Sequence, residues 1–331
     1  MAPALLPCFG QTLFQPETGR NRYPSKDNIL LKQLQGPVVS RLERAATFEG
    51  KRAIPAGFLV FVEPSPVMSR LPAIDPEHPD QAELIIRRLS QYAELGPDEV
   101  ELLRSLSETP ERLAPGTELI AEGERLENPR LLLAGWACRQ RYLSDGRRQI
   151  FDFILPGDIY GLCLRPQAVA LCGAVTLTRA TISNASALGD AVLTHPEGYP
   201  GLTGACLMSA STDEAYLLAQ MVRIGRQTAY ERVAHLLLEL HYRLSVVGLA
   251  NENFMPLPLT QEIIADALGL SIVHLNRTLQ QLRRDGVVEV KGGVARILDR
   301  GRLANIADFH APRVSARRTD NGGMRLHAAA P

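Results

Sequence analysis

The stretch from Leu257 to Arg296, LPLTQEIIADALGLSIVHLNRTLQQLRRDGVVEVKGGVAR, decides how this chain is to be interpreted. Thr260 has the hydroxyl of a helix N-cap, and apolar residues follow it at helical spacing. Gly269 comes where a helix would end in a residue of positive φ, and Ser271 can cap a second helix. The pattern therefore predicts two short helices joined by a tight turn.

The second of these helices is followed by a predicted β-hairpin. Its inward face consists of leucines, and it ends at Gly286. The hairpin then has a two-glycine turn between two valine-rich strands, Val287–Val290 and Val294–Leu298. A helix-turn-helix with such a wing places its second helix in the major groove of DNA.

The outward face of the second helix is rich in hydrogen-bond donors. Arg277 can pair bidentately with guanine, Asn276 with adenine, and Arg284 suits a phosphate contact. A small helical hairpin with a solvated polar face is the alternative, but turn, wing and donors together favour DNA binding. The predicted DNA-binding residues are Thr260, Ser271, Val273, His274, Asn276, Arg277, Gln280, Arg284 and Lys291.

The segment ADALGLSIVHLNRTLQQLRRDGVVE resembles the winged helix-turn-helix of the Crp/Fnr transcription regulators, and the resemblance extends from about Ala82 to Asp308. It implies a DNA-binding regulator with double-stranded DNA and RNA polymerase as partners, and no enzymatic activity. Arg277 keeps the arginine of the family motif, whereas Val273 stands where the family has a glutamate. This departure implies an operator sequence different from the common family half-site.

The composition sets few limits on this reading. The formal net charge is zero, so a basic footprint has to be local, as at Arg277, Arg283, Arg284 and Lys291. No secretory signal and no membrane-spanning run is evident, so a cytoplasmic protein is expected. The five cysteines lack metal-ligand spacing and are expected to be reduced packing residues; no cofactor is predicted.

Two terminal segments differ from the rest. Residues 1–80 are punctuated by proline, and residues 313–331 are polar and alanine-rich. Both are expected to be disordered. For residues 1–80, a start codon placed too far upstream or an additional regulatory arm are the alternatives.

Residues 81–203 are expected to form a sensor domain. Two helical patterns, around Leu84–Tyr92 and Pro97–Leu106, precede short strands separated by regularly spaced turn glycines. The stretch is similar to the double-stranded β-roll of cyclic-nucleotide-binding domains, so the expected fold class is α+β.

Residues 204–227 are expected to form a dimerisation helix, and residues 228–312 the DNA-binding domain, which Thr228 and Glu231 open with a capping box. On the first helix the predicted dimer interface is the stripe Leu218, Met221, Val222 and Gly225. A helix lying on its own roll is the alternative; the family resemblance implies pairing with a second copy.

An effector pocket is expected around Tyr160, Gly161, Leu162 and Arg165. In the family a glutamate and an arginine hold the cyclic nucleotide, but here Leu162 and the apolar Ala168–Leu171 replace them. Cyclic AMP is therefore not expected, and the effector stays open, with an approach of Cys163 to Cys172 as one redox alternative to simple burial.

The predicted function is a homodimeric regulator on a palindromic operator. The alternatives are a ligand- or redox-sensing module with vestigial DNA binding, and an enzyme that carries a regulatory roll.

Overall fold

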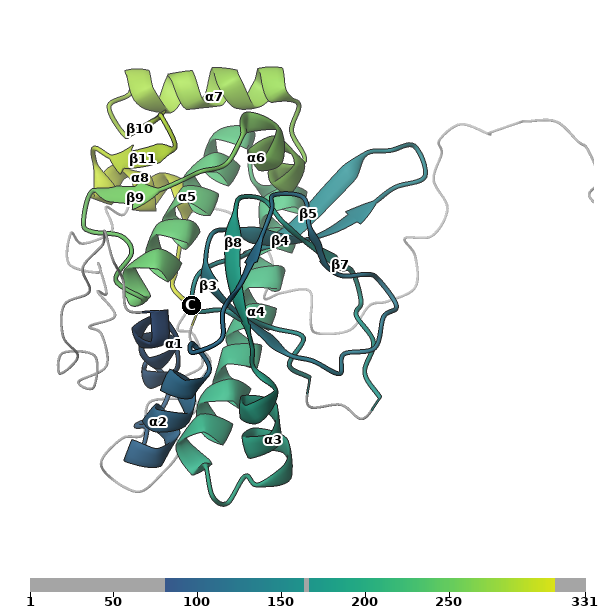
Figure 1. Cartoon of the computed structure of the whole chain (residues 1–331). Helices are drawn as coiled ribbons and strands as arrows, with labels where there is room; N and C mark the ends of the chain where they lie inside the picture. Colours follow the sequence, from purple (N-terminus) through teal and green to yellow (C-terminus); the bar gives the residue numbers. More distant parts are fainter. Residues whose placement is uncertain (1–80, 164–166, 313–331) are drawn as a thin grey trace, which may run out of the picture. The chain divides into compact units, whose positions relative to one another are not determined.

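The computed structural model describes residues 81–163 and 167–312. The predictions for residues 1–80, for residues 313–331 and for Arg165 lie outside these ranges. Within them the chain forms a β-roll, a long helix and a helix-turn-helix domain with a small sheet, which confirms the α+β fold class (Figure 1).

The roll follows two short helices, α1 (Gln81–Ser90) and α2 (Pro97–Ser105), both predicted from the sequence. Its strands pair antiparallel in two sheets, ordered β1-β8-β3-β6 and β2-β7-β4-β5. Their bounds are β1 (Glu111–Leu113), β2 (Glu118–Ile120), β3 (Arg130–Ala134), β4 (Ala137–Tyr142), β5 (Arg148–Ile154), β6 (Ile159–Tyr160), β7 (Gly173–Thr176) and β8 (Ala180–Asn184).

Glycines make the turns of the roll, as their spacing predicts. Gly135 has φ +86°, and a Cβ there would lie 2.1 Å from the carbonyl oxygen of Arg179. Only glycine fits this turn, because an L side chain would be strained and would collide with backbone. Between the two sheets lies a core of small and branched apolar side chains: Leu132, Ala137, Ile154, Ala174, Ala180 and Ile182.

A long helix, α4 (Pro200–Arg226), follows the roll after the short helix α3 (Ser186–Thr194). It begins four residues before the predicted start at Gly204, with proline in its first turn, where the missing N–H costs nothing. The next helix, α5 (Ala229–Val246), begins at the predicted capping box, in which Glu231 accepts from the backbone N–H of Thr228 at 2.8 Å.

The remaining elements form the winged helix-turn-helix: β9 (Phe254–Pro256), α6 (Gln261–Leu268), α7 (Ile272–Arg284), β10 (Val288–Lys291), β11 (Val294–Ile297) and α8 (Arg300–Ala307). The wing sheet has three strands, in the order β10-β11-β9, where the sequence analysis predicted two. The extra strand is short and ends in proline, so it lacks the length and alternation that reveal a strand. No helix in the described ranges is both long and apolar enough to cross a membrane.

Candidate functional site

Local hydrogen bonds fix the turn between α6 and α7. The hydroxyl of Thr260 accepts from the backbone N–H of Ile263 at 3.3 Å, and that of Ser271 from His274 at 3.2 Å. Gly269 takes the left-handed conformation with φ +61° and ends α6. These contacts confirm the predicted caps and the predicted turn, and they set the direction in which α7 leaves it.

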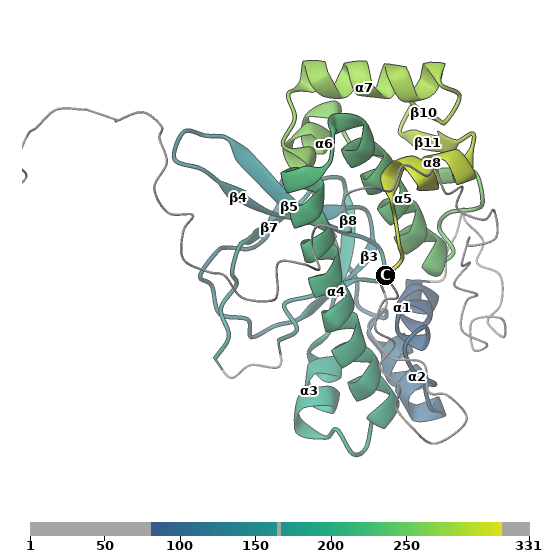
Figure 2. The ribbon, with the colours of Figure 1, turned by 180° about the vertical axis from the view of Figure 1, so that it is seen from behind.

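Helix α7 separates an apolar face from a polar one. Leu275 and Leu282 are fully buried, and the buried hydroxyl of Thr278 donates to the carbonyl oxygen of His274 at 2.9 Å. The opposite face carries the predicted DNA-binding residues of the helix: Val273, His274, Arg277, Gln280 and Arg284 are exposed, and Asn276 is half-buried. In both views α7 lies at the outer edge of its domain (Figures 1 and 2).

An ion pair connects the wing to the end of α7. Arg283 lies 3.2 Å from Glu289 of β10, while Lys291 at the end of β10 is exposed. Tyr230 donates to Asp285, just after α7, at 2.7 Å. Sequence spacing did not reveal these contacts, which leave Arg284 and Lys291 as the more available cations on this side.

Helix α4 also has two faces. Tyr216, Gln220 and Arg223 are buried against the roll and the DNA-binding domain, and Gln220 donates to the carbonyl oxygen of Ala267 at 2.6 Å. On the other face the predicted dimer stripe is exposed, with Leu218 57%, Met221 71% and Val222 56% accessible and Gly225 open to solvent. The opposite face of α4 thus packs on the roll, while the stripe itself is left uncovered, and its pairing with a second copy stays a prediction.

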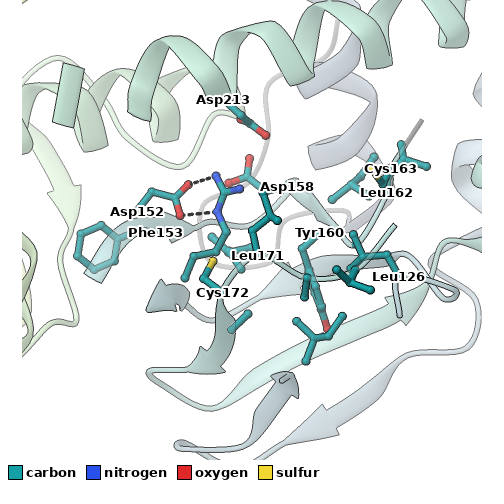
Figure 3. Close-up of a pocket in the computed structure, with 18 of the residues that line it drawn as sticks. Leu126, Asp152, Phe153, Asp158, Tyr160, Leu162, Cys163, Leu171, Cys172 and Asp213 are labelled. Carbon is teal, nitrogen blue, oxygen red and sulfur yellow. Dashed lines mark hydrogen bonds and ion pairs between the residues drawn. The ribbon is translucent and has the colours of Figure 1, made fainter. Parts of the chain in front are cut away.

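A cavity of about 230 Å³ lies between the roll, α4 and α5 (Figure 3). Tyr160, Gly161 and Leu162 line it, so three of the four predicted pocket residues share this space. Cys163 and Cys172 also line it but lie on different sides of it. Nothing in the described part of the chain brings their sulfur atoms together, and no group of His, Cys, Asp and Glu there is suited to hold a metal ion.

Most charged groups of the cavity wall are paired. Arg139 of β4 donates to both carboxylate oxygens of Asp152 of β5, each at 2.7 Å. Asp158 accepts from Arg243 of α5 at 2.7 Å and lies 3.3 Å from Arg88 of α1. Burial acts to raise the pKa of Asp158, but the two guanidinium groups outweigh it, so the pKa is lowered and the carboxylate is held ionised.

Asp213 of α4 is the exception in this wall. Its nearest cation is the Nη2 of Arg88, at 3.6 Å, which is too long for a hydrogen bond. Within the described ranges no group donates a hydrogen bond to its carboxylate. The side chain is 38% accessible. Burial raises the pKa of Asp213 to about 6, although Arg88 acts to lower it.

Comparisons with known proteins agree with this geometry. Residues 231–306 match the Crp-like helix-turn-helix domain. The chain is 30% identical over 204 residues to the nitrogen fixation regulation protein FixK of Azorhizobium caulinodans, covering 59% of this chain and 77% of that protein. It is 29% identical over 225 residues to the transcriptional activatory protein AadR of Rhodopseudomonas palustris, covering 67% and 90%.

The structure of FixK2 from Bradyrhizobium japonicum is similar over 60% of this chain and 96% of that one, at 30% identity and a TM-score of 0.52. A β-roll, a long helix and a capped, winged helix-turn-helix together define a DNA-binding regulator with an attached β-roll domain. The chain belongs to the Crp/Fnr family of transcription regulators.

Proposed function

We propose that this regulator acts as a homodimer that binds an inverted repeat in DNA. The observation that carries the proposal is the exposed stripe Leu218, Met221 and Val222 on one face of α4. A second copy that covers this stripe would remove three large apolar side chains from water, which stabilises a dimer. Pairing around a twofold axis presents two copies of α7, and an inverted repeat has the same symmetry. DNA and RNA polymerase, in the cytoplasm, are the proposed partners.

Within each half-site, we assign base reading to the first turns of α7. Arg277 and Asn276 lie there with donors that suit guanine and adenine edges, and Val273 can contact a thymine methyl group. Arg284 and Lys291 lie farther along and contact phosphates in this proposal. Thr260 and Ser271 position the two helices through their caps.

The signal is proposed to act at the roll and to be something other than cyclic AMP. Leu162, Val169, Ala170 and Leu171 give the cavity wall an apolar surface where a nucleotide needs polar partners. The cations that the described residues give the wall, Arg139 and Arg243, are already paired with Asp152 and Asp158. A cyclic phosphate would compete with these carboxylates for the guanidinium groups, and breaking the buried pair of Arg243 and Asp158 is costly.

Sedimentation and gel shifts test this proposal together. The full chain should sediment as a dimer, and a duplex with two inverted half-sites should bind far more tightly than one with a single half-site. A monomer that binds the single half-site as tightly as the repeat would contradict the dimer proposal.

A further inference from the structure

Asp213 is a carboxylate that receives no hydrogen bond from the residues that the structure describes. The other acidic groups of the cavity wall have theirs: Asp152 receives two bonds from Arg139, and Asp158 receives one from Arg243 and one from the backbone N–H of Leu155. Asp213 has only Arg88 at 3.6 Å and faces the cavity next to Asp158 (Figure 3). Its side chain is 38% accessible, so the carboxylate is open to the cavity and can accept a hydrogen bond from a donor that enters it.

The size and the lining of the cavity limit which molecules can bind beside Asp213. The volume of about 230 Å³ is below the range of about 300–1,000 Å³ that holds drug-sized ligands. Asp213 lies at the charged end of the cavity, beside Asp158 and the ion pair of Asp152, while apolar side chains such as Leu126 and Leu162 line the other side (Figure 3). Both guanidinium groups that the described residues give the wall are paired with carboxylates, so an anionic ligand would have to compete with these ion pairs.

We propose that the cavity binds a small, largely apolar molecule that carries an amine or another N–H donor and presents it to Asp213. This inference rests on the proposed function, because it names the chemical class of the signal that acts at the roll. An ammonium group would form a charge-assisted hydrogen bond with the carboxylate, and such bonds are about twice as strong as neutral ones.

The cavity also has a direct connection to the DNA-binding domain. Arg243 lines it and belongs to α5, within the residues that match the Crp-like helix-turn-helix domain. The Nε of Arg243 is buried and has no hydrogen-bond partner in the described ranges, while its Nη2 donates to Asp158 and to the carbonyl oxygen of Phe153. A ligand in the cavity therefore lies against a side chain of the domain that it regulates.

The test uses three probes of similar shape and different charge: benzylamine, benzyl alcohol and benzoate. Their affinities for the full chain are measured by ligand-observed NMR at neutral pH. We expect benzylamine to bind most tightly and benzoate most weakly. In Asp213→Asn the amine should lose about tenfold in affinity, as for one charge-assisted hydrogen bond. Asp145→Asn, at an exposed turn on the roll, is the matched control and should leave all three affinities unchanged.

The outcomes separate this inference from the proposed function. Equal affinities of the three probes, preference for benzoate, or no binding of any probe to the wild type would overturn the inference. None of these results affects the dimer or its inverted repeat, which are measured without ligand. Gel shifts with unliganded Asp213→Asn should match the wild type, which also shows that this variant is folded.

Discussion

Arg243 of α5 donates a hydrogen bond at 2.7 Å to Asp158, which lies in the turn between β5 and β6. Both side chains are buried, with 3% and 14% of their surface accessible. The pair joins the first helix of the DNA-binding domain to the β-roll, and Arg88 of α1 lies 3.3 Å from the same carboxylate. The buried carboxylate of Asp158 thus connects the roll, α5 and α1.

Asp158→Asn should lower the free energy of unfolding by about 3 kcal/mol at neutral pH, because it leaves two buried guanidinium groups without their carboxylate. The pKa of Asp158 is lowered in the folded state, so its contribution is present above the unfolded pKa of about 3.9 and is lost as the pH falls through the folded value. The difference between the variant and the wild type should therefore shrink in acid. Urea unfolding at several pH values measures it.

The control for this prediction is Arg147→Ala. Arg147 pairs with Asp145 at 2.8 Å, but both side chains are more than half exposed. Exposed pairs contribute about 0–1 kcal/mol, so this variant should unfold almost as the wild type does. Equal losses from the buried and the exposed variant would contradict the role given to Asp158.

Leu218→Asp should dissociate the dimer. The change places an uncompensated charge at the centre of the exposed stripe, where the second copy would bury it. Sedimentation should show a monomer, and affinity for the inverted repeat should collapse because one α7 makes too few contacts. Leu193→Asp, at an exposed leucine of α3, should remain dimeric. A dimeric Leu218→Asp protein would place the interface elsewhere.

Arg277→Ala should change the sequence preference, whereas Arg284→Ala should lower the affinity for all DNA sequences. Arg277 lies near the start of α7, so its loss should cost about 1–3 kcal/mol on the specific site and relax the preference at one base pair. Arg284 lies about two turns later, and its loss should weaken binding to all sequences and reduce the salt dependence. Gel shifts on specific and unrelated duplexes at several salt concentrations compare them. If both variants lose the same affinity on specific and unrelated duplexes, Arg277 contacts phosphate and does not read a base.

Calorimetry with cyclic AMP and cyclic GMP should show no binding at physiological concentrations. The reason is the apolar surface of Leu162 and Val169 to Leu171, together with the absence of a free cation in the described cavity wall. Binding of either nucleotide with micromolar affinity would contradict this, and Arg165 would then be the first residue to replace.

The sequence was sufficient for the features that depend on local chemistry. Thr260 and Ser271 cap helices, Thr228 and Glu231 open α5 with a capping box, and Gly135 occupies a turn that only glycine fits. Each of these depends on residues that are near one another in the chain. The exposed stripe of α4 was identified in the same way, from helical spacing alone.

The charged network of the cavity could not be predicted in this way. Asp158 and Arg243 are 85 residues apart, and Arg88 reaches the same carboxylate from α1. No spacing rule connects them, because folding brings them together from three elements. Strand β9 was missed for a related reason: it is three residues long and owes its existence to pairing with β11.

Selection of bound sequences from a random duplex library tests the central claim most directly. Full-length protein is incubated with the library, and the recovered duplexes are sequenced. The account predicts an inverted repeat whose half-sites are centred about one helical turn, roughly 10 base pairs, apart, with the most constrained positions under Arg277 and Asn276. Recovery of a single motif without a repeat, or of no preferred sequence, would contradict a dimeric, sequence-specific regulator.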